Sequence, residues 1–224
     1  MSKQFRINLI ASLICFLVPL IGYLLTMSSS IDFLDSGEFA LVTKLGSIAH
    51  PPGNPAYVLS AWIWVNFLEL FTSDNIFLIT LFSAISVSLS IVFIYNTAFH
   101  FLKHIPNNKF SELQIAIIAT ISALSMAFGM TFWDVATTIE VYGYHLLAGA
   151  IMINGLSKYQ LYKNYKYLAI GALGYSLALA NHHVTPVFFT PFILFFFAEE
   201  LFNKISKKKR KIGFVDFFKK DFYG

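Results

Sequence analysis

Long apolar stretches recur along this chain, and they constrain its fold more than any other feature. A helix needs roughly 20 mostly apolar residues to cross a bilayer. Six stretches approach or exceed that length, so we expect an all-α, polytopic membrane protein. Pro186 separates the last two stretches and predicts a hairpin there, because proline cannot continue a helix. The six predicted spans are Ile7–Met27, Ile76–Leu102, Leu113–Phe132, Val141–Gln160, Tyr167–Thr185 and Pro186–Phe202.

The composition supports the same class of protein. Hydrophobic residues make up 57% of the 224 residues and charged residues only 12%, whereas soluble domains are about 25% charged. The composition excludes a soluble enzyme, a nucleic-acid-binding protein and a disordered chain. Cys15 is the single cysteine, so an intramolecular disulfide and a cysteine-based zinc site are excluded as well.

A seventh apolar stretch, Ala56–Phe71, is short and carries Asn66 and Glu69. We expect it to lie in the membrane interface as an amphipathic helix. With six spans and this surface helix, 15 of the 16 Lys and Arg residues lie on one side of the membrane, and Lys44 alone lies on the other. Basic loops face the cytoplasm. Both termini are therefore expected to be cytoplasmic, in a multi-pass protein of the bacterial plasma membrane.

The expected organisation is one membrane domain over residues 1–224, with a first external loop at 28–75 and a basic cytoplasmic tail at 203–224. The first apolar stretch is longer than the apolar region of a signal peptide, so we interpret it as a retained anchor.

Unusual polar residues gather in the three external loops of this topology. Ionisable groups at a membrane are expensive and commonly face a cavity or a partner. We therefore predict a pocket on the external face formed by Asp35, Glu38, His50, Glu140 and His182. The candidate site residues, in chain order, are Asp35, Glu38, His50, Pro51, Asp134, Glu140, Tyr142, Asn181, His182 and His183.

Purely structural roles remain open for some of these residues. Asp35 and Glu38 have the spacing of a capping box, in which Asp35 caps a short helix and Glu38 reaches back to it. Glu140, three residues after Thr137, is compatible with a helix start in the same way. His182 and His183 are adjacent, so their side chains diverge on a helix and make a poor metal pair. The sequence assigns no metal site.

The segment from His50 to Pro55 has a different character, since it contains three prolines and Gly53. Prolines stiffen the backbone, and glycine permits a tight turn. Asn54 and Pro55 are typical of the cap and first residue of a helix. This loop is expected to hold His50 rigidly beside the helix that begins at Asp35, and rigid placement of an acid and an imidazole suits proton transfer.

These motifs carry a resemblance. The sequence Asp-Ser-Gly-Glu-Phe at 35–39, followed by Gly-Ser-Ile-Ala-His-Pro-Pro-Gly-Asn-Pro at 46–55, resembles the protein O-mannosyltransferase-like family of GT-C membrane glycosyltransferases, long labelled a domain of unknown function. The segments Trp133-Asp134, Glu140-Val141-Tyr142 and Asn181-His182-His183 are also similar. Family members are longer, so the chain is expected to be the N-terminal portion of such a protein.

The resemblance implies a GT-C-like fold and transfer of a sugar from a polyprenyl-phosphate donor to an acceptor hydroxyl, on protein or glycan, at the external membrane face. It places the catalytic acid at Asp35 or Glu38, and it places the family's His-Pro-Pro element at His50, Pro51 and Pro52. We expect Asp35 to be the base and the histidines to contact the donor phosphate. The expected partners are the lipid-linked donor, the acceptor and membrane lipids, with no separate cofactor. A non-catalytic membrane subunit, a fragment of such an enzyme and a small transporter remain alternatives.

Overall fold

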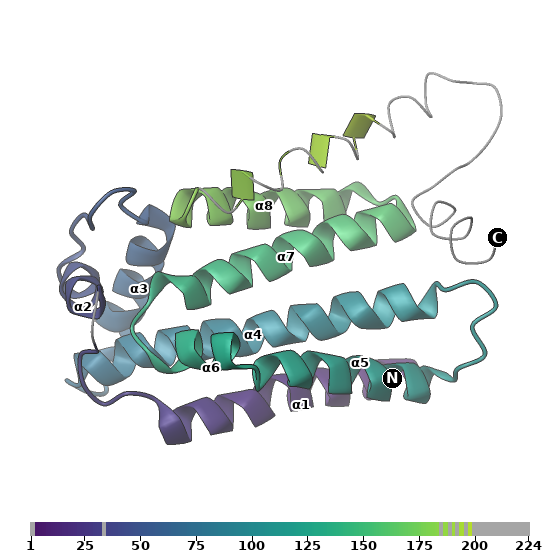
Figure 1. Ribbon diagram of the computed structural model, residues 1–224, viewed down its shortest axis with the longest axis horizontal. Coiled ribbons are helices and arrows are strands. Elements are labelled where there is room, and N and C mark those ends of the chain that lie inside the picture. Colours follow the sequence, from purple (N-terminus) through teal and green to yellow (C-terminus); the bar gives the residue numbers. More distant parts are fainter. Residues whose placement is uncertain are drawn as a thin grey trace. The chain divides into compact units, whose positions relative to one another are not determined.

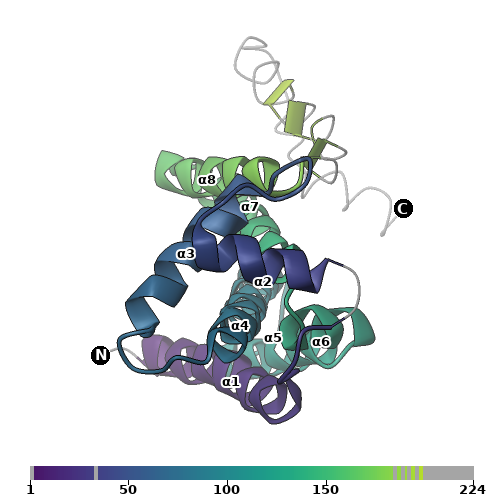
Figure 2. The same cartoon turned by 90° about the vertical axis from the view of Figure 1, so that its left-hand side faces the viewer.

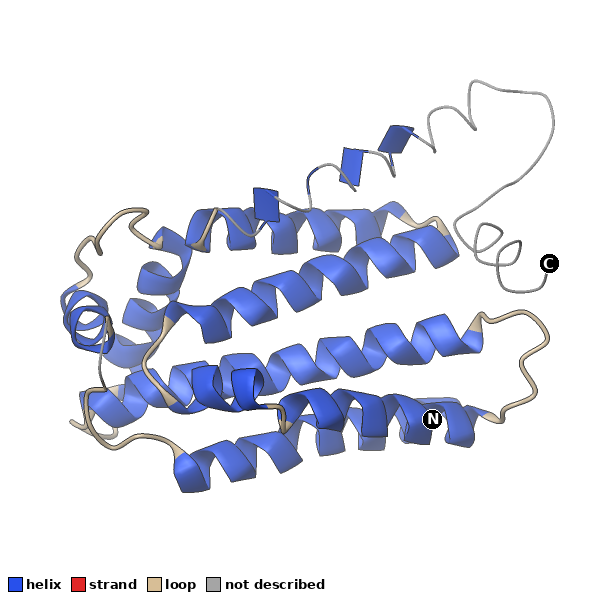
Figure 3. Ribbon diagram, viewed as in Figure 1, coloured by secondary structure: helices blue, strands red, loops and turns tan. Residues whose placement is uncertain are grey.

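The computed structural model describes residues 3–32, 35–183, 186–187, 190, 193–194 and 197–198. All its regular structure is helical (Figure 3), which agrees with the predicted all-α class. The chain falls into two units, Met1–His183 and Val184–Gly224. The first unit contains α1 (Lys3–Thr26), α2 (Ser36–Leu45), α3 (Pro55–Leu68), α4 (Asn75–Lys103), α5 (Glu112–Ala127), α6 (Met130–Thr137), α7 (Val141–Tyr162) and α8 (Tyr165–Asn181).

The first unit is a bundle built around α4. Helix α4 packs against α1, α5 and α7, and α7 packs in turn against α8. These five helices run alongside one another, while α2 and α3 lie together at one end of the bundle (Figures 1 and 2). The links from α1 to α2 and from α3 to α4 also lie at that end. The predicted external loop at 28–75 therefore contains two helices, α2 and α3.

Small side chains let α1, α4 and α5 approach closely. Ala119 and Ala123 of α5 are fully buried in a cluster that includes Cys15 of α1 and Ile91 of α4. Close approach without a strong hydrophobic driving force is the way helices associate in membranes. A second core lies beneath α2 and α3, where Phe39, Tyr57, Val65, Ile79 and Ile139 are buried together.

The prediction of six spans is wrong for the described residues. Only α1 and α4 are long and apolar enough to cross a membrane as single helices, and the bent pair of α5 and α6 raises the number to at most three. Helix α7 carries His145, Asn154 and Lys158 among its apolar residues, and these residues lower its mean hydropathy. Helix α8 has 17 residues, fewer than the roughly 20 that a span needs. The protein remains an integral membrane protein with two to three candidate spans.

The third predicted span is broken where α5 meets α6. The two helices are bent by 63°, and Gly129 stands at the break with an extended backbone. A Cβ atom on Gly129 would lie 3.1 Å from the carbonyl oxygen of Met126. The break frees carbonyls that a continuous helix would pair, and the buried hydroxyl of Tyr23 in α1 donates to one of them, the Ala127 oxygen, at 2.8 Å.

Helices α7 and α8 are antiparallel neighbours in contact through glycines. A Cβ atom on Gly155 would lie 2.3 Å from the backbone nitrogen of Gly171, and one on Gly174 would lie 2.4 Å from that of Met152. The absence of side chains at these positions therefore fixes the separation of the two helices. It also fixes where Asn181, the last residue of α8, meets the start of α7.

In the second unit, the described residues are helical, and the Thr190 hydroxyl donates to the Pro186 carbonyl oxygen at 3.4 Å. The predicted hairpin at Pro186, most of the sixth predicted span and the basic tail at 203–224 lie outside the described residues.

Candidate functional site

The first element of the site is the N-terminal end of α2. Asp35 occupies the cap position, as the sequence predicts, but its side chain makes no capping hydrogen bond. Its backbone is in the right-handed helical region, with φ −83° and ψ −2°, whereas a capping residue usually has β-region angles that aim its oxygen at the first turn. The capping-box interpretation is therefore wrong, and the Asp35 carboxylate, with a side chain 55% exposed, is left for other contacts.

Glu38 contacts His50 and does not reach back to the cap. One carboxylate oxygen accepts the backbone N–H of His50 at 2.6 Å, and the other lies 2.8 Å from His50 Nδ1. The opposite ring nitrogen, Nε2, is 3.9 Å from Oδ2 of Asp35. His50 therefore stands between the two carboxylates, as the rigid loop predicts, with Glu38 in hydrogen-bonding contact and Asp35 in longer electrostatic contact.

The loop that carries His50 is held by packing as well as by these bonds. The His50 ring lies 5.8 Å from that of Phe39, and Phe39 makes an edge contact with Tyr57 of α3. Phe39 and Tyr57 are both buried, as is Ala49 next to the histidine. The imidazole is consequently fixed by α2 and α3 together.

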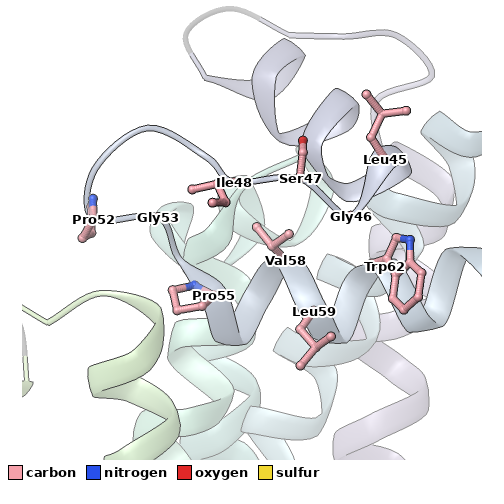
Figure 4. Close-up of a pocket in the computed structure, with 10 residues that line it drawn as sticks. All are labelled: Leu45, Gly46, Ser47, Ile48, Pro52, Gly53, Pro55, Val58, Leu59 and Trp62. Atoms are coloured by element: carbon pink, nitrogen blue, oxygen red, sulfur yellow. The ribbon is translucent and has the colours of Figure 1, made fainter.

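Three residues with positive φ, Gly46, Gly53 and Asn54, shape this loop. Gly46 ends α2 in the left-handed region with φ 63°, and a Cβ there would lie 2.9 Å from Nε1 of Trp62 (Figure 4). Only glycine satisfies both constraints without strain. Asn54 and Pro55 then start α3 at the predicted positions. Pro51 is exposed in the turn between them, where the backbone N–H of Gly53 donates to the His50 oxygen at 2.7 Å.

Glu38 and His50 shift each other's pKa in opposite directions. The two hydrogen bonds from His50, backbone first and side chain second, lower the pKa of Glu38. The hydrogen bond to Glu38 raises the pKa of His50, and the negative charges of Glu38, Asp35 and Glu140 raise it further. The ionised carboxylate and the imidazolium therefore stabilise each other.

The same three residues have the geometry of a small cation site. One ligand atom each from Asp35, Glu38 and His50 lies within 4.8 Å of the others. Two carboxylates and an imidazole form a donor set that suits a divalent metal such as Zn²⁺ or Mn²⁺. The sequence assigns no metal site, and the arrangement shows only that these side chains are close enough to share an ion.

Glu140 extends the cluster from a second element. It is the cap residue of α7 and, like Asp35, makes no side-chain capping bond. Burial is the main cause that raises its pKa, and the negative charges of Asp35 and Asp134 raise it further. This coupling to Asp35 and His50 places Glu140 near the start of α2. Asp134 is exposed on α6.

His182 belongs to a different cluster, between the ends of α7 and α8. Its ring lies 5.9 Å from that of His145 and 5.8 Å from that of Tyr142, and His183 stacks beside it at 6.4 Å. The side-chain amide of buried Asn181 donates to the Val141 carbonyl oxygen at 3.1 Å. The Asn181, His182 and His183 side chains, which the sequence groups with Asp35, therefore gather around the first turn of α7.

Sequence reasoning missed His145 in this second cluster. Its Nδ1 atom is buried without a hydrogen-bond partner among the described residues, as are Nδ1 of His182 and Oδ1 of Asn181. The signal that could have revealed it is its spacing of three residues from Tyr142, which puts both on one face of a helix. The segment 140–142 joins the two clusters, since Glu140 influences the first and Val141 is bonded to the second.

The fold and the two clusters define a helical integral membrane protein with an acid–imidazole site at one end of its bundle. Comparison with known families then gives its relationship: the chain belongs to the family described as Protein O-mannosyl-transferase TMEM260 N-terminal domain, which matches residues 35–206. That range contains both clusters and confirms the family resemblance of the motifs.

A curated relative supports the same relationship at greater distance. The Protein O-mannosyl-transferase tmem260 of Dictyostelium discoideum is 23% identical over 183 residues, an alignment that covers 76% of this chain and 21% of that protein. The chain thus spans about a fifth of the length of this relative. No solved structure matches the chain.

Proposed function

We propose that this chain forms the acid-bearing part of a membrane glycosyltransferase that moves mannose from a polyprenyl-phosphate-linked donor to an acceptor hydroxyl on a protein. Membership of the family and the description of its Dictyostelium relative support the reaction class. The cluster of Asp35, Glu38 and His50 at one end of the bundle supports the location of the chemistry.

The observation that carries the proposal is the unequal engagement of the two carboxylates. Both oxygens of Glu38 contact His50, whereas Asp35 is exposed and makes no capping bond. A general base must have an oxygen free to accept a proton from the attacking hydroxyl. Asp35 therefore fits the role of base, and Glu38 fits that of the residue that orients and charges His50.

The reaction has two electrostatic requirements that this arrangement addresses. As the acceptor oxygen attacks the anomeric carbon, its proton passes to Asp35, and the bond from that carbon to the donor phosphate breaks. The departing phosphate needs a positive charge or N–H donors. His50, whose pKa is raised by Glu38, supplies an imidazolium next to the base.

The remaining predicted residues have roles consistent with their positions. In this proposal Glu140 and Asp134 contact the acceptor, and Tyr142, His182 and His183 contact the sugar or phosphate. Buried Asn181 holds the end of α8 against the start of α7 through its bond to the Val141 oxygen. In this proposal the site faces outside, both termini are cytoplasmic, and α3 lies in the outer interface of the plasma membrane.

A transfer assay tests the assignment. Membranes that contain the chain are incubated with a polyprenyl-phosphate mannose and a peptide rich in Ser and Thr. Replacing Asp35 by Asn is expected to lower the rate by roughly 100-fold or more, as loss of a general base does. Glu112→Gln is the matched control, because that carboxylate pairs with Lys103 and has no part in the proposed site.

Three outcomes would contradict the proposal in different ways. Full activity of Asp35→Asn would remove Asp35 as the base, and loss confined to Glu38→Gln would move the role to Glu38. An inactive wild-type chain in folded form would favour the alternative of a non-catalytic membrane subunit. This alternative is tested because the alignment covers only 21% of the relative's length.

A further inference from the structure

Basic and aromatic side chains gather at the end of the bundle opposite the acid–imidazole cluster. There the connection between α7 and α8 lies beside the C-terminal end of α4 (Figure 1). Nδ1 of His100 is 2.7 Å from the Tyr162 hydroxyl, and the His104 ring lies 5.1 Å from the Tyr162 ring. The Tyr162 ring lies 5.8 Å from that of Tyr167 on α8. These contacts hold the ends of the three helices together.

Two lysines at this end share one aromatic ring. Nζ of Lys158 lies 5.6 Å from the centroid of the Tyr167 ring, and Nζ of Lys166 lies 4.9 Å from it. The two ammonium groups are therefore at most about 10.5 Å apart. Lys158 is half-buried on α7, and Lys166 is exposed on α8. Burial lowers the pKa of Lys158, and the charge of Lys166 lowers it further, so the charged form of Lys158 lacks an opposite charge to stabilise it.

The described part of the chain supplies no carboxylate for these two lysines. Helices α1, α4, α7 and α8 contain no Asp or Glu, and α5 contains only Glu112, which pairs with Lys103 at 2.8 Å. None of the ion pairs among the described residues includes either lysine. A half-buried cation without a counter-ion is costly. This end of the bundle therefore favours an anion from outside the chain.

An exposed apolar stripe begins beside the lysine pair. Ile170 and Leu173 follow Lys166 by four and seven residues, so the three lie on one face of α8. Ile170 is 39% exposed and Leu173 is 57% exposed. On α7, exposed Ile153 precedes Lys158 by five residues, which is roughly 7.5 Å along the axis. A positive end followed by apolar side chains matches a phospholipid, in which the phosphate is joined to acyl chains.

We propose that Lys158 and Lys166 bind the phosphate of an anionic phospholipid whose acyl chains lie along Ile170 and Leu173. Lysine stems are flexible, so both ammonium groups can approach one phosphate. A headgroup of net negative charge is preferred, because the ammonium of a zwitterionic headgroup is repelled by the same lysines. Basic pockets between membrane helices bind anionic headgroups in this way. The bound lipid joins α7 to α8 at the end of the bundle opposite the proposed sugar transfer, and the site does not depend on that reaction.

Lipid retention by the purified chain tests this site. The protein is reconstituted in nanodiscs of phosphatidylcholine and phosphatidylglycerol in equal parts, released into detergent, and its bound lipids are identified and counted by native mass spectrometry. Lys158→Gln and Lys166→Gln remove one charge each, and Lys158→Arg keeps the charge. Lys109→Gln is the matched control, because Lys109 is exposed in the loop between α4 and α5 at the same end of the bundle.

We expect the wild type to retain phosphatidylglycerol over phosphatidylcholine. Its affinity should be about fivefold weaker in each of Lys158→Gln and Lys166→Gln, since one basic residue contributes on that scale at an anionic membrane surface. Lys158→Arg should keep the preference, and Lys109→Gln should lose less than about twofold, because an exposed charge outside the site is screened.

Four results would overturn the proposal. Equal retention of both lipids by the wild type would show that the headgroup charge is not recognised. A loss in Lys109→Gln equal to that in Lys158→Gln would show attraction by the general surface charge. A loss in Lys158→Arg equal to that in Lys158→Gln would show an effect on packing and not on charge. Displacement of the lipid by glycerol 3-phosphate at equal concentration would show a site for soluble phosphates, because that molecule has the phosphate without acyl chains.

Discussion

Replacing Gly155 by Ala should separate α7 from α8. The added Cβ would lie 2.3 Å from the nitrogen and 2.6 Å from the Cα of Gly171, whereas carbon atoms in contact normally sit about 3.5–4.0 Å apart. Because the obstructing atoms are backbone, no side-chain rotation relieves the overlap. The helices must therefore move apart by roughly 1 Å, the shortfall between these distances.

The cost follows from that displacement. Overpacking a core costs typically about 1–3 kcal/mol, and the upper end applies here because backbone meets backbone. Alanine is a better helix former than glycine by about 1 kcal/mol, which offsets part of the loss. The net destabilisation of Gly155→Ala is then about 2 kcal/mol.

Gly149 provides a matched control on the same helix. Among the described residues, no atom beyond the neighbouring residues and backbone of α7 itself lies within 4 Å of a Cβ placed there. Gly149→Ala should therefore gain the helix propensity of about 1 kcal/mol without overlap. The two alanine variants should therefore differ by about 3 kcal/mol, which corresponds to roughly 6–12 °C in Tm for a chain of this size.

Thermal unfolding of the detergent-solubilised proteins, followed by circular dichroism, measures this difference. Melting temperatures for Gly155→Ala and Gly149→Ala within about 2 °C of each other, less than 1 kcal/mol, would refute the argument that backbone contact between glycines sets the distance from α7 to α8.

Two further predictions concern charge and capping. Glu38→Gln should lower the pKa of His50, measured by NMR titration, toward the ordinary value of about 6.5; part of the rise should remain because Asp35 and Glu140 also raise it. In the wild type, stability from this pair should be complete between about pH 4.5 and pH 6.5, lost as pH rises through the raised pKa of His50 and lost as pH falls through the lowered pKa of Glu38. An unchanged titration of His50 in Glu38→Gln would contradict the assignment. Ser111→Ala should destabilise the protein by about 1 kcal/mol in chemical unfolding, because Ser111 and Gln114 form a reciprocal capping box; Ser122→Ala, which removes only a hydroxyl bonded within α5, should cost less than about 0.5 kcal/mol.

The local starts of helices were readable from the sequence because they depend on neighbouring residues. Asp35 and Asn54 stand at the predicted cap positions, and the proline-rich loop brings His50 to Glu38. The contact between Glu38 and His50, in place of a capping contact, could not be predicted from the sequence. Choosing between a capping contact and a contact twelve residues away depends on the backbone angles of Asp35, which a sequence pattern does not report.

The number of spans was overestimated for a related reason. Hydrophobic content stays high through Gly129, so the stretch 113–132 has the composition of one straight helix although it bends by 63°. Composition measures how apolar a segment is and not the direction in which it runs. His145 was missed for the same reason, because its partner His182 follows the end of another helix, α8.

The bond from Tyr23 to Ala127 bears on where the folding unit begins. The family match starts at residue 35. The Ala127 carbonyl oxygen, which the break after α5 leaves without a helical partner, accepts its hydrogen bond from Tyr23 of α1, and α1 ends at Thr26. A bare carbonyl in the bilayer interior costs several kcal/mol by the scale for unsatisfied polar groups. A shortened chain that starts at residue 35 would retain every proposed catalytic residue and would lose the hydrogen bond that Tyr23 donates to the Ala127 oxygen. The segment that the family match covers, 35–206, therefore leaves out a helix, α1, that the fold of this chain uses.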